Sequence, residues 1–249
     1  MTVTILFCAL LPASAKAQTT NVHSVALNPA NTQDVIHLFT TFQTTDLPSW
    51  LHSTLAATMP PKSDSDTFAR ATWLSQLHIV QDETTCARLT EQTASVLKLF
   101  GADKTVRFFI YYDDYPNMQT IAGSFLGLST GLVRLLKRDT ADNAQLIGLV
   151  AHELARRIQQ ERFITAWKNE DLKTLRAFEL FYDAVATATL NHLRLPSQQY
   201  ALILQRMIAH ATLNNTDRTR HPDLEQRQSV IRTIALSQSS VTEIRPSLN

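Results

Sequence analysis

The chain has 249 residues, of which 44% are hydrophobic, and its formal net charge at pH 7 is +1. This length and apolar content suffice for one well-buried domain with a small appendage. The near-neutral charge excludes the strong basic field that is typical of nucleic-acid binding proteins, and also a strongly acidic surface.

The first residues are typical of a secretory signal peptide. Met1–Leu11 is a short apolar run, and the small residues after Pro12 offer cleavage sites that end at Ala15 or Ala17. A membrane anchor is the alternative, but the run has only about half the length needed to span a bilayer. We therefore expect residues 1–17 to be removed from a periplasmic or secreted protein that keeps no membrane span.

Residues 18–67 are predicted to form an N-terminal extension and linker. They contain one helical pattern, Asn31–Phe42, and later a loop-like stretch rich in Pro, Ser and Asp. The sequence leaves open whether this extension packs on the main domain or only tethers it. Once residues 1–17 are removed, Cys86 is the only cysteine, which excludes an intramolecular disulfide.

Residues 68–236 are predicted to form a mainly helical α+β domain with a small β-sheet, followed by a disordered tail over 237–249. Gly101 is predicted to end a helix in the left-handed conformation. β-branched and aromatic residues predict a strand over Thr105–Tyr112 and two extended pieces within Gln119–Ser129. Apolar spacing predicts helices over Phe68–Ile79, Thr84–Phe100, Thr130–Lys137, Asp142–Glu161, Leu172–Leu193, Ser197–Leu213 and Pro222–Leu236.

The helix predicted over Asp142–Glu161 carries the motif HELAR, from His152 to Arg156. In zinc peptidases with the pattern H-E-x-x-H, two histidines one turn apart bind the same Zn²⁺, and the glutamate acts on the metal-bound water. Here Arg156 stands where the second histidine would be. A His-Glu pair on a helix is common, so the motif carries little information by itself.

Two acidic residues lie one turn apart on the next long helix. Glu179 and Asp183 have apolar neighbours, which predicts that they point into a polar pocket inside the fold rather than into solvent. In gluzincins, one class of zinc peptidase, the third ligand is a Glu from a following helix, and a carboxylate one turn later orients a histidine ligand. His221, on the loop before the last helix, could approach a metal or simply cap that helix.

The order of these motifs resembles one family throughout: the zinc metallopeptidases that include the CAAX prenyl endopeptidase, the HtpX heat-shock protease and the periplasmic protease BepA. The resemblance covers Thr84–Arg232. It implies a gluzincin-type fold and a role in proteolysis and protein quality control. The pieces that carry it are VRFFIYYDDYPN, NMQTIAGSFLGLSTGLVRLL, HELAR, E-x-x-x-D from Glu179 to Asp183, Leu195–Pro196 and the RHP of Arg220 to Pro222.

The resemblance also implies roles for individual residues. His152 and Glu179 would be zinc ligands, and Glu153 would be the catalytic base. Asp183 would orient His152, and His221 would lie on a loop over the zinc and could occupy its open position. The strand over Ala122–Leu128 would be an edge strand along which a peptide substrate lies by strand addition, and its residues include Ala122, Gly123, Ser124, Phe125 and Leu126.

Arg156 departs from the family pattern in the way that matters most for the chemistry. Its guanidinium cannot lose its proton at a working pH, so it cannot bind zinc, and it would place positive charge where the cation should lie. Because it follows His152 by one turn and faces the helix of Glu179, we expect it to pair with Glu179 and fill the metal site. A second departure is Phe181 with Tyr182, which replace a more polar pair.

Two functions are compatible with these residues. The first is a degenerate peptidase, with zinc binding weak or absent, that binds a polypeptide or an envelope protein in its groove without hydrolysis. The second is an active zinc metalloendopeptidase that uses His152, Glu179 and His221 as ligands and Glu153 as general base, which requires Arg156 to turn away, for example toward Asp183. A helical structural domain with accidental motifs is a third interpretation, and the ordered series of matches opposes it.

Overall fold

The computed structural model describes residues 32–41, 46–58, 76–121, 125–137, 143–158, 160–213 and 221–242. Several predictions fall outside the described residues: the signal peptide over 1–17, the loop over 59–66, most of the helix predicted from Phe68, and the positions of Ala122, Gly123 and Ser124.

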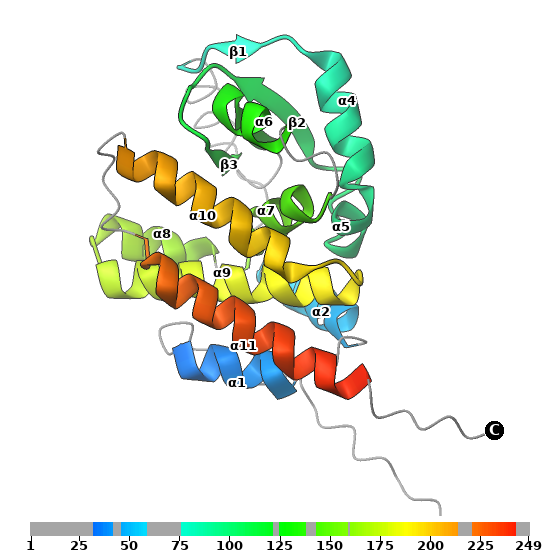
Figure 1. The fold of residues 1–249 in the computed structure, drawn as a ribbon, viewed down its shortest axis with the longest axis vertical. Coiled ribbons are helices and arrows are strands. Elements are labelled where there is room, and N and C mark those ends of the chain that lie inside the picture. Colours follow the sequence, from blue (N-terminus) through cyan, green and yellow to red (C-terminus); the bar gives the residue numbers. More distant parts are fainter. Residues whose placement is uncertain are drawn as a thin grey trace, which may run out of the picture.

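The fold is built around the long helix α9 (Leu172–His192). Asp171 begins this helix by accepting a hydrogen bond from the Thr174 N–H at 3.1 Å. Residues Ala177 to Leu190 are all buried, and a helix that is buried on every side is stable only when other elements surround it. Its neighbours are α1 (Thr32–Thr41), α2 (Leu47–Thr58), α7 (Ala144–Ala155), α8 (Gln160–Lys168), α10 (Ser197–Leu213) and α11 (Leu224–Thr242), as Figure 1 shows.

One small sheet lies at the α7 side of the helices, so the fold is a mainly helical α+β arrangement, as predicted. In spatial order its strands are β1 (Ile79–Val80), β2 (Arg107–Tyr111), β4 (Phe125–Ser129) and β3 (Met118–Ile121). β2 and β4 are parallel, and the other two pairs are antiparallel. The short helices α4 (Glu83–Gln92) and α5 (Ala94–Leu99) connect β1 to β2, α6 (Thr130–Lys137) follows β4, and β3 contacts α7.

The prediction of an edge strand at Phe125 and Leu126 is wrong. These residues belong to β4, which is hydrogen-bonded to β2 on one side and to β3 on the other. The edge strand beside α7 is β3. Both extended pieces were visible in the sequence, but their order in the sheet depends on the connection that inserts β4 between β2 and β3, and residue types do not encode that order.

α1 and α2 belong to the same hydrophobic core as α9, so these two helices of the N-terminal extension pack on the rest of the fold rather than only tether it. The ring of Phe39 packs edge-on against Trp50, with centroids 5.4 Å apart, and lies 6.2 Å from the ring of Phe181. α2 was not predicted, although its buried residues follow helical spacing; they are Leu47, Trp50, Leu51 and Leu55.

The helix predicted over Asp142–Glu161 is two helices. The N–H groups of Arg156, Arg157 and Ile158 bond to carbonyls three residues earlier, at 3.3, 3.1 and 2.8 Å. This tighter turn ends α7 at Ala155 and turns Ile158 into the core, and α8 begins at Gln160. Because α7 ends at Ala155, Arg156 is its C-cap residue.

Other boundaries differ from the predictions by smaller amounts. The helix predicted over Thr84–Phe100 is divided at Thr93, and Ile79 lies in β1 rather than in a helix. α11 continues to Thr242, so the first residues of the predicted tail are helical. Gly101 has φ +60° and ends its helix as predicted.

Candidate functional site

α7 and α9 bring four acidic or basic residues together inside the core. His152 and Glu153 on α7 are 5% and 4% exposed, and Glu179 and Asp183 on α9 are 4% and 0% exposed. The prediction that both acids of α9 point into the fold is confirmed. α7 is buried along its whole length, from Ala144 to Ala155, because α10 and β3 pack against the helix.

Arg156 pairs with Glu179, as predicted. Its Nη2 donates to Glu179 Oε1 at 2.9 Å, and the side chains of Arg156 and Glu179 are 27% and 5% exposed. Burial by itself lowers the pKa of Arg156, but the charges of Glu153 and Glu179 outweigh burial and raise that pKa above its ordinary value. The guanidinium is therefore permanently charged one turn after His152.

Tyr182, one of the two aromatic residues at which the sequence departs from the family that it resembles, packs against this arginine. The guanidinium carbon of Arg156 lies 5.9 Å from the ring centres of both Tyr182 and Phe163, within the range of a cation–π contact. The Tyr182 ring also meets the His152 ring edge-on at 5.5 Å. An aromatic side chain at this position thus suits an arginine neighbour.

The second carboxylate oxygen of Glu179 lies between two histidines. Glu179 Oε2 is 3.4 Å from His152 Nε2 and 3.3 Å from His221 Nδ1. Burial by itself raises the pKa of Glu179, but Arg156 and the two histidines hold it well below its ordinary value. The structure thus brings His152, Glu179 and His221 together, with Arg156 on the same carboxylate.

Asp183 is held by an arginine that the sequence analysis did not assign to the site. Arg227, on α11, donates from Nε to Asp183 Oδ2 and from Nη2 to Asp183 Oδ1, both at 2.7 Å. Tyr200, on α10, donates to Asp183 Oδ1 at 2.6 Å, and His152 Nδ1 lies 3.0 Å from the same oxygen. Arg227 outweighs the effect of burial and lowers the pKa of Asp183.

The charged groups around His152 determine the direction in which its pKa shifts. Two arginines, Arg156 and Arg227, face three carboxylates, Glu153, Glu179 and Asp183. Burial lowers the pKa of His152, but the hydrogen bonds and charges of Asp183 and Glu179 outweigh it and raise that pKa. A protonated His152 would balance the charges, so the site can be neutral without a metal ion.

Glu153, the expected general base, is bound to the edge strand. The Thr120 N–H donates to Glu153 Oε2 at 3.0 Å, and Thr120 Oγ1 lies 2.9 Å from the same oxygen and 3.1 Å from the Glu153 carbonyl oxygen. The other carboxylate oxygen lies 3.4 Å from Arg156 Nε. Both oxygens of Glu153 therefore already face a donor.

A cleft of about 250 Å³ opens onto these residues. Its apolar wall comes from α7, α10 and β3, and its polar floor is the site just described. The apolar residues that line it are Pro116, Met118, Leu149, Leu204, Met207 and Ile208. A cleft in which polar groups converge beside an apolar wall is typical of a ligand site.

The candidate zinc ligands at the bottom of the cleft contact one another and Arg156. In the described part of the chain, no group of three or more His, Cys, Asp or Glu side chains has an arrangement that could hold a metal ion. Both oxygens of Glu179 are already in contact with cationic or imidazole groups, and a guanidinium beside the ligands opposes a second cation.

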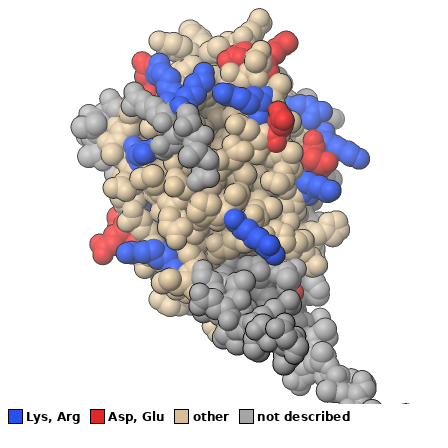
Figure 2. Space-filling model, turned by 45° about the vertical axis from the view of Figure 1, so that its right-hand side comes forward, with Lys and Arg blue, Asp and Glu red and all other residues tan. Residues whose placement is uncertain are grey.

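Comparison of the sequence with models of known protein families and with curated proteins found no match in either set. Within the described ranges, no helix has both the length and the apolar character needed to cross a membrane. On the face shown in Figure 2, basic side chains lie among acidic ones, and uncharged side chains cover the middle.

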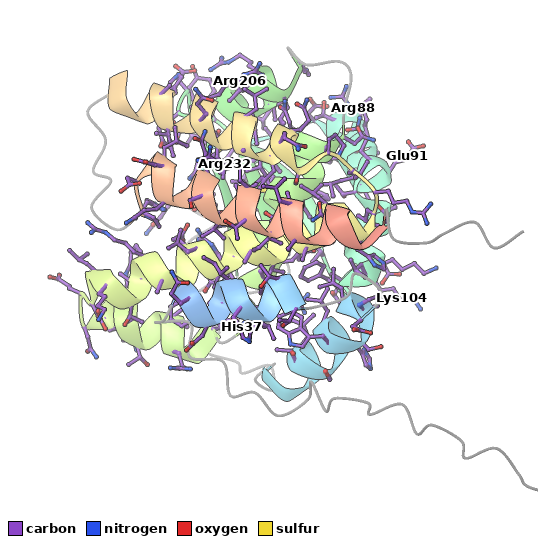
Figure 3. All side chains as sticks on the ribbon, turned by 60° about the horizontal axis from the view of Figure 1, so that its bottom comes forward. His37, Arg88, Glu91, Lys104, Arg206 and Arg232 are labelled. Atoms are coloured by element: carbon purple, nitrogen blue, oxygen red, sulfur yellow. The ribbon has the colours of Figure 1, made fainter. Side chains whose placement is uncertain are left out.

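Sequence reasoning missed Arg227, Tyr200 and Thr120. The sequence did contain a signal for Arg227. This arginine lies at helical spacing from the buried apolar residues Val230, Ile231 and Ile234, so it interrupts an apolar stripe. Arg232, later on the same helix, is exposed and is labelled in Figure 3. No comparable signal existed for Thr120, because its partner lies on an element remote in sequence.

Gly148 allows Tyr200 to approach α7, and a Gly148→Ala variant should be less stable. A Cβ at this position would lie 2.7 Å from the Tyr200 ring. Alanine favours the helix by about 1 kcal/mol, but overpacking costs about 1–3 kcal/mol, so the expected net loss is about 1 kcal/mol in urea denaturation. In a Tyr200→Ala background the same change should cost nothing; a loss there too would contradict the assigned clash.

Proposed function

We propose that this protein is a degenerate metallopeptidase that binds a polypeptide without zinc-dependent hydrolysis. The observation that carries the proposal is the ion pair between Arg156 Nη2 and Glu179 Oε1 at 2.9 Å, on the helices that carry His152 and Asp183. A zinc peptidase of the kind that the resemblance implies would need Glu179 as a ligand. Here the guanidinium of Arg156 is instead hydrogen-bonded to that carboxylate.

The chemistry of Glu153 supports the same proposal. A general base must be able to approach a water molecule and take its proton. In this site one oxygen of Glu153 accepts from the Thr120 N–H, and the other faces Arg156. Because Thr120 holds Oε2 and Oε1 lies 3.4 Å from a permanent cation, this carboxylate is poorly placed to act as a base.

A polypeptide is the proposed ligand because of the cleft and the strand that borders it. The cleft offers an apolar wall for side chains, and β3 is an edge strand whose outer backbone groups could pair with an extended chain. The signal-peptide pattern of the N-terminal segment indicates export, so the proposed partner is an envelope protein.

Zinc content tests this proposal directly. The unmodified protein, purified in the presence of zinc, should contain little metal, and an Arg156→His variant should bind about one zinc ion per chain, because it restores a second imidazole and removes the cation. Elemental analysis by mass spectrometry measures both. Arg162→His, which places a histidine on the exposed face of α8, is the matched control and should bind no zinc at this site.

One result would favour the active zinc endopeptidase instead. Glu179 Oε2 lies within 3.4 Å of both His152 and His221, which are the other two ligands of that alternative. Near-stoichiometric zinc in the unmodified protein, lost in His221→Ala, together with cleavage of casein that stops in Glu153→Gln, would overturn the proposal.

A further inference from the structure

β3 presents an open backbone edge beside the cleft. Gln119 faces Gly127 across the β3–β4 ladder, and the Ser129 N–H donates to the Asn117 carbonyl at 3.0 Å. Alternate residues of an antiparallel strand direct their backbone groups to opposite sides, so Thr120 directs its N–H and C=O away from β4. Such an edge is a template for the addition of another strand.

The carboxylate of Glu153 accepts the hydrogen bond of the Thr120 N–H, which is the donor that an added strand would need. Glu153 Oε2 accepts from this N–H at 3.0 Å and from the Thr120 hydroxyl at 2.9 Å. The Glu153 side chain is 5% exposed, so water competes little for these contacts. The contacts between Thr120 and Glu153 therefore tie β3 to α7 and cover the edge at this point.

Glu153 also has a second position within reach. Its Oε1 lies 3.4 Å from Arg156 Nε, and that nitrogen has no hydrogen-bond partner among the described residues. If Glu153 left the Thr120 N–H, it could move toward this unsatisfied donor and remain paired. The contact with Thr120 can thus be broken without leaving a buried charge alone.

We infer that Thr120 and Glu153 form a latch that closes the β3 edge, and that an extended polypeptide binds by displacing Glu153 from the Thr120 N–H. The inference rests on the proposed polypeptide binding and names the contact that regulates it. It also gives Glu153 a role that requires no metal ion.

Binding of fluorescein-labelled casein, an unstructured polypeptide, tests the latch by fluorescence anisotropy. Glu153→Leu removes the acceptor and should bind about tenfold more tightly, because the competing charge-assisted hydrogen bond is gone. Thr120→Val keeps the N–H and the β-branched shape but removes the hydroxyl, so it should tighten binding less. Thr130→Val is the matched control: its hydroxyl also makes two contacts, donating to the Asp113 carbonyl at 2.8 Å and accepting from the Asp113 N–H at 3.2 Å, and its loss should leave the affinity unchanged.

Amide hydrogen exchange provides a readout that does not depend on a ligand. The Thr120 amide should exchange faster in Glu153→Leu than in the unmodified protein, and casein should protect it again. Exchange that is unchanged in Glu153→Leu, or casein affinities equal to that of the unmodified protein, would overturn the latch while leaving polypeptide binding in place. If exchange rises but no variant binds casein, both the proposed function and the gating role are wrong.

Discussion

An Arg227→Leu variant should lose about 3–5 kcal/mol of unfolding free energy, because it leaves the buried carboxylate of Asp183 without its principal partner. Asp183 is fully buried, and each of its oxygens accepts a 2.7 Å hydrogen bond from Arg227. Tyr200 and His152 contact only one oxygen and cannot replace the bidentate pair. Urea denaturation at pH 7 measures the loss.

Arg232→Leu is the control for Arg227→Leu. It makes the same substitution on the same helix, but Arg232 is exposed, and its Nε reaches only the Gln228 carbonyl at 3.4 Å. Its effect should stay within about 0.5 kcal/mol. Arg227→Lys keeps the charge but loses the planar fork, so its loss should be intermediate. Equal losses in the two leucine variants would contradict the role assigned to Arg227.

The elements with strong periodic patterns could be predicted from the sequence. α6, α9 and α10 were expected within one or two residues of their observed bounds, and the apolar neighbours of Glu179 and Asp183 correctly indicated that both acids are buried. The pairing of Arg156 with Glu179 was also foreseen, since both the helix geometry and the unpaired charge required it.

The remaining features depend on tertiary contacts that no local pattern encodes. The end of α7 at Ala155 follows from a tight turn that buries Ile158 in the core. The order of β3 and β4 follows from the crossover between β2 and β4. Thr120 meets Glu153 only because this order places β3 against α7, so the contact that occupies the expected base could not be predicted.

An Arg156→Leu variant should lose about 3 kcal/mol of unfolding free energy at pH 7, because Glu179 would remain buried with only histidine neighbours. The partial exposure of Arg156, at 27%, places this loss at the lower end of the range for a broken buried pair. Urea denaturation measures it, and Arg162→Leu on the exposed face of α8 is the control. A loss of less than about 1 kcal/mol would mean that water screens the pair.

The loss in Arg156→Leu should also depend on pH in a defined direction. In the unmodified protein the pKa of Glu179 lies well below its ordinary value of 4.5, so its contribution to stability is full above that value and falls as the pH falls through the folded-state pKa. Without Arg156, burial raises the pKa of Glu179, and protonation then relieves an unpaired charge. The stability difference between the two proteins should therefore shrink as the pH falls from 7 toward 4.

A double variant separates the ion pair from the rest of the site. Arg156→Leu with Glu179→Leu removes both charges, and replacing a buried pair by apolar residues is often neutral or stabilising. The double variant should therefore recover most of the stability lost in Arg156→Leu, and its stability relative to the unmodified protein should no longer rise as the pH falls. If the second substitution instead adds to the loss, then Glu179 is stabilised mainly by His152 and His221, and Arg156 is not the group that closes the site.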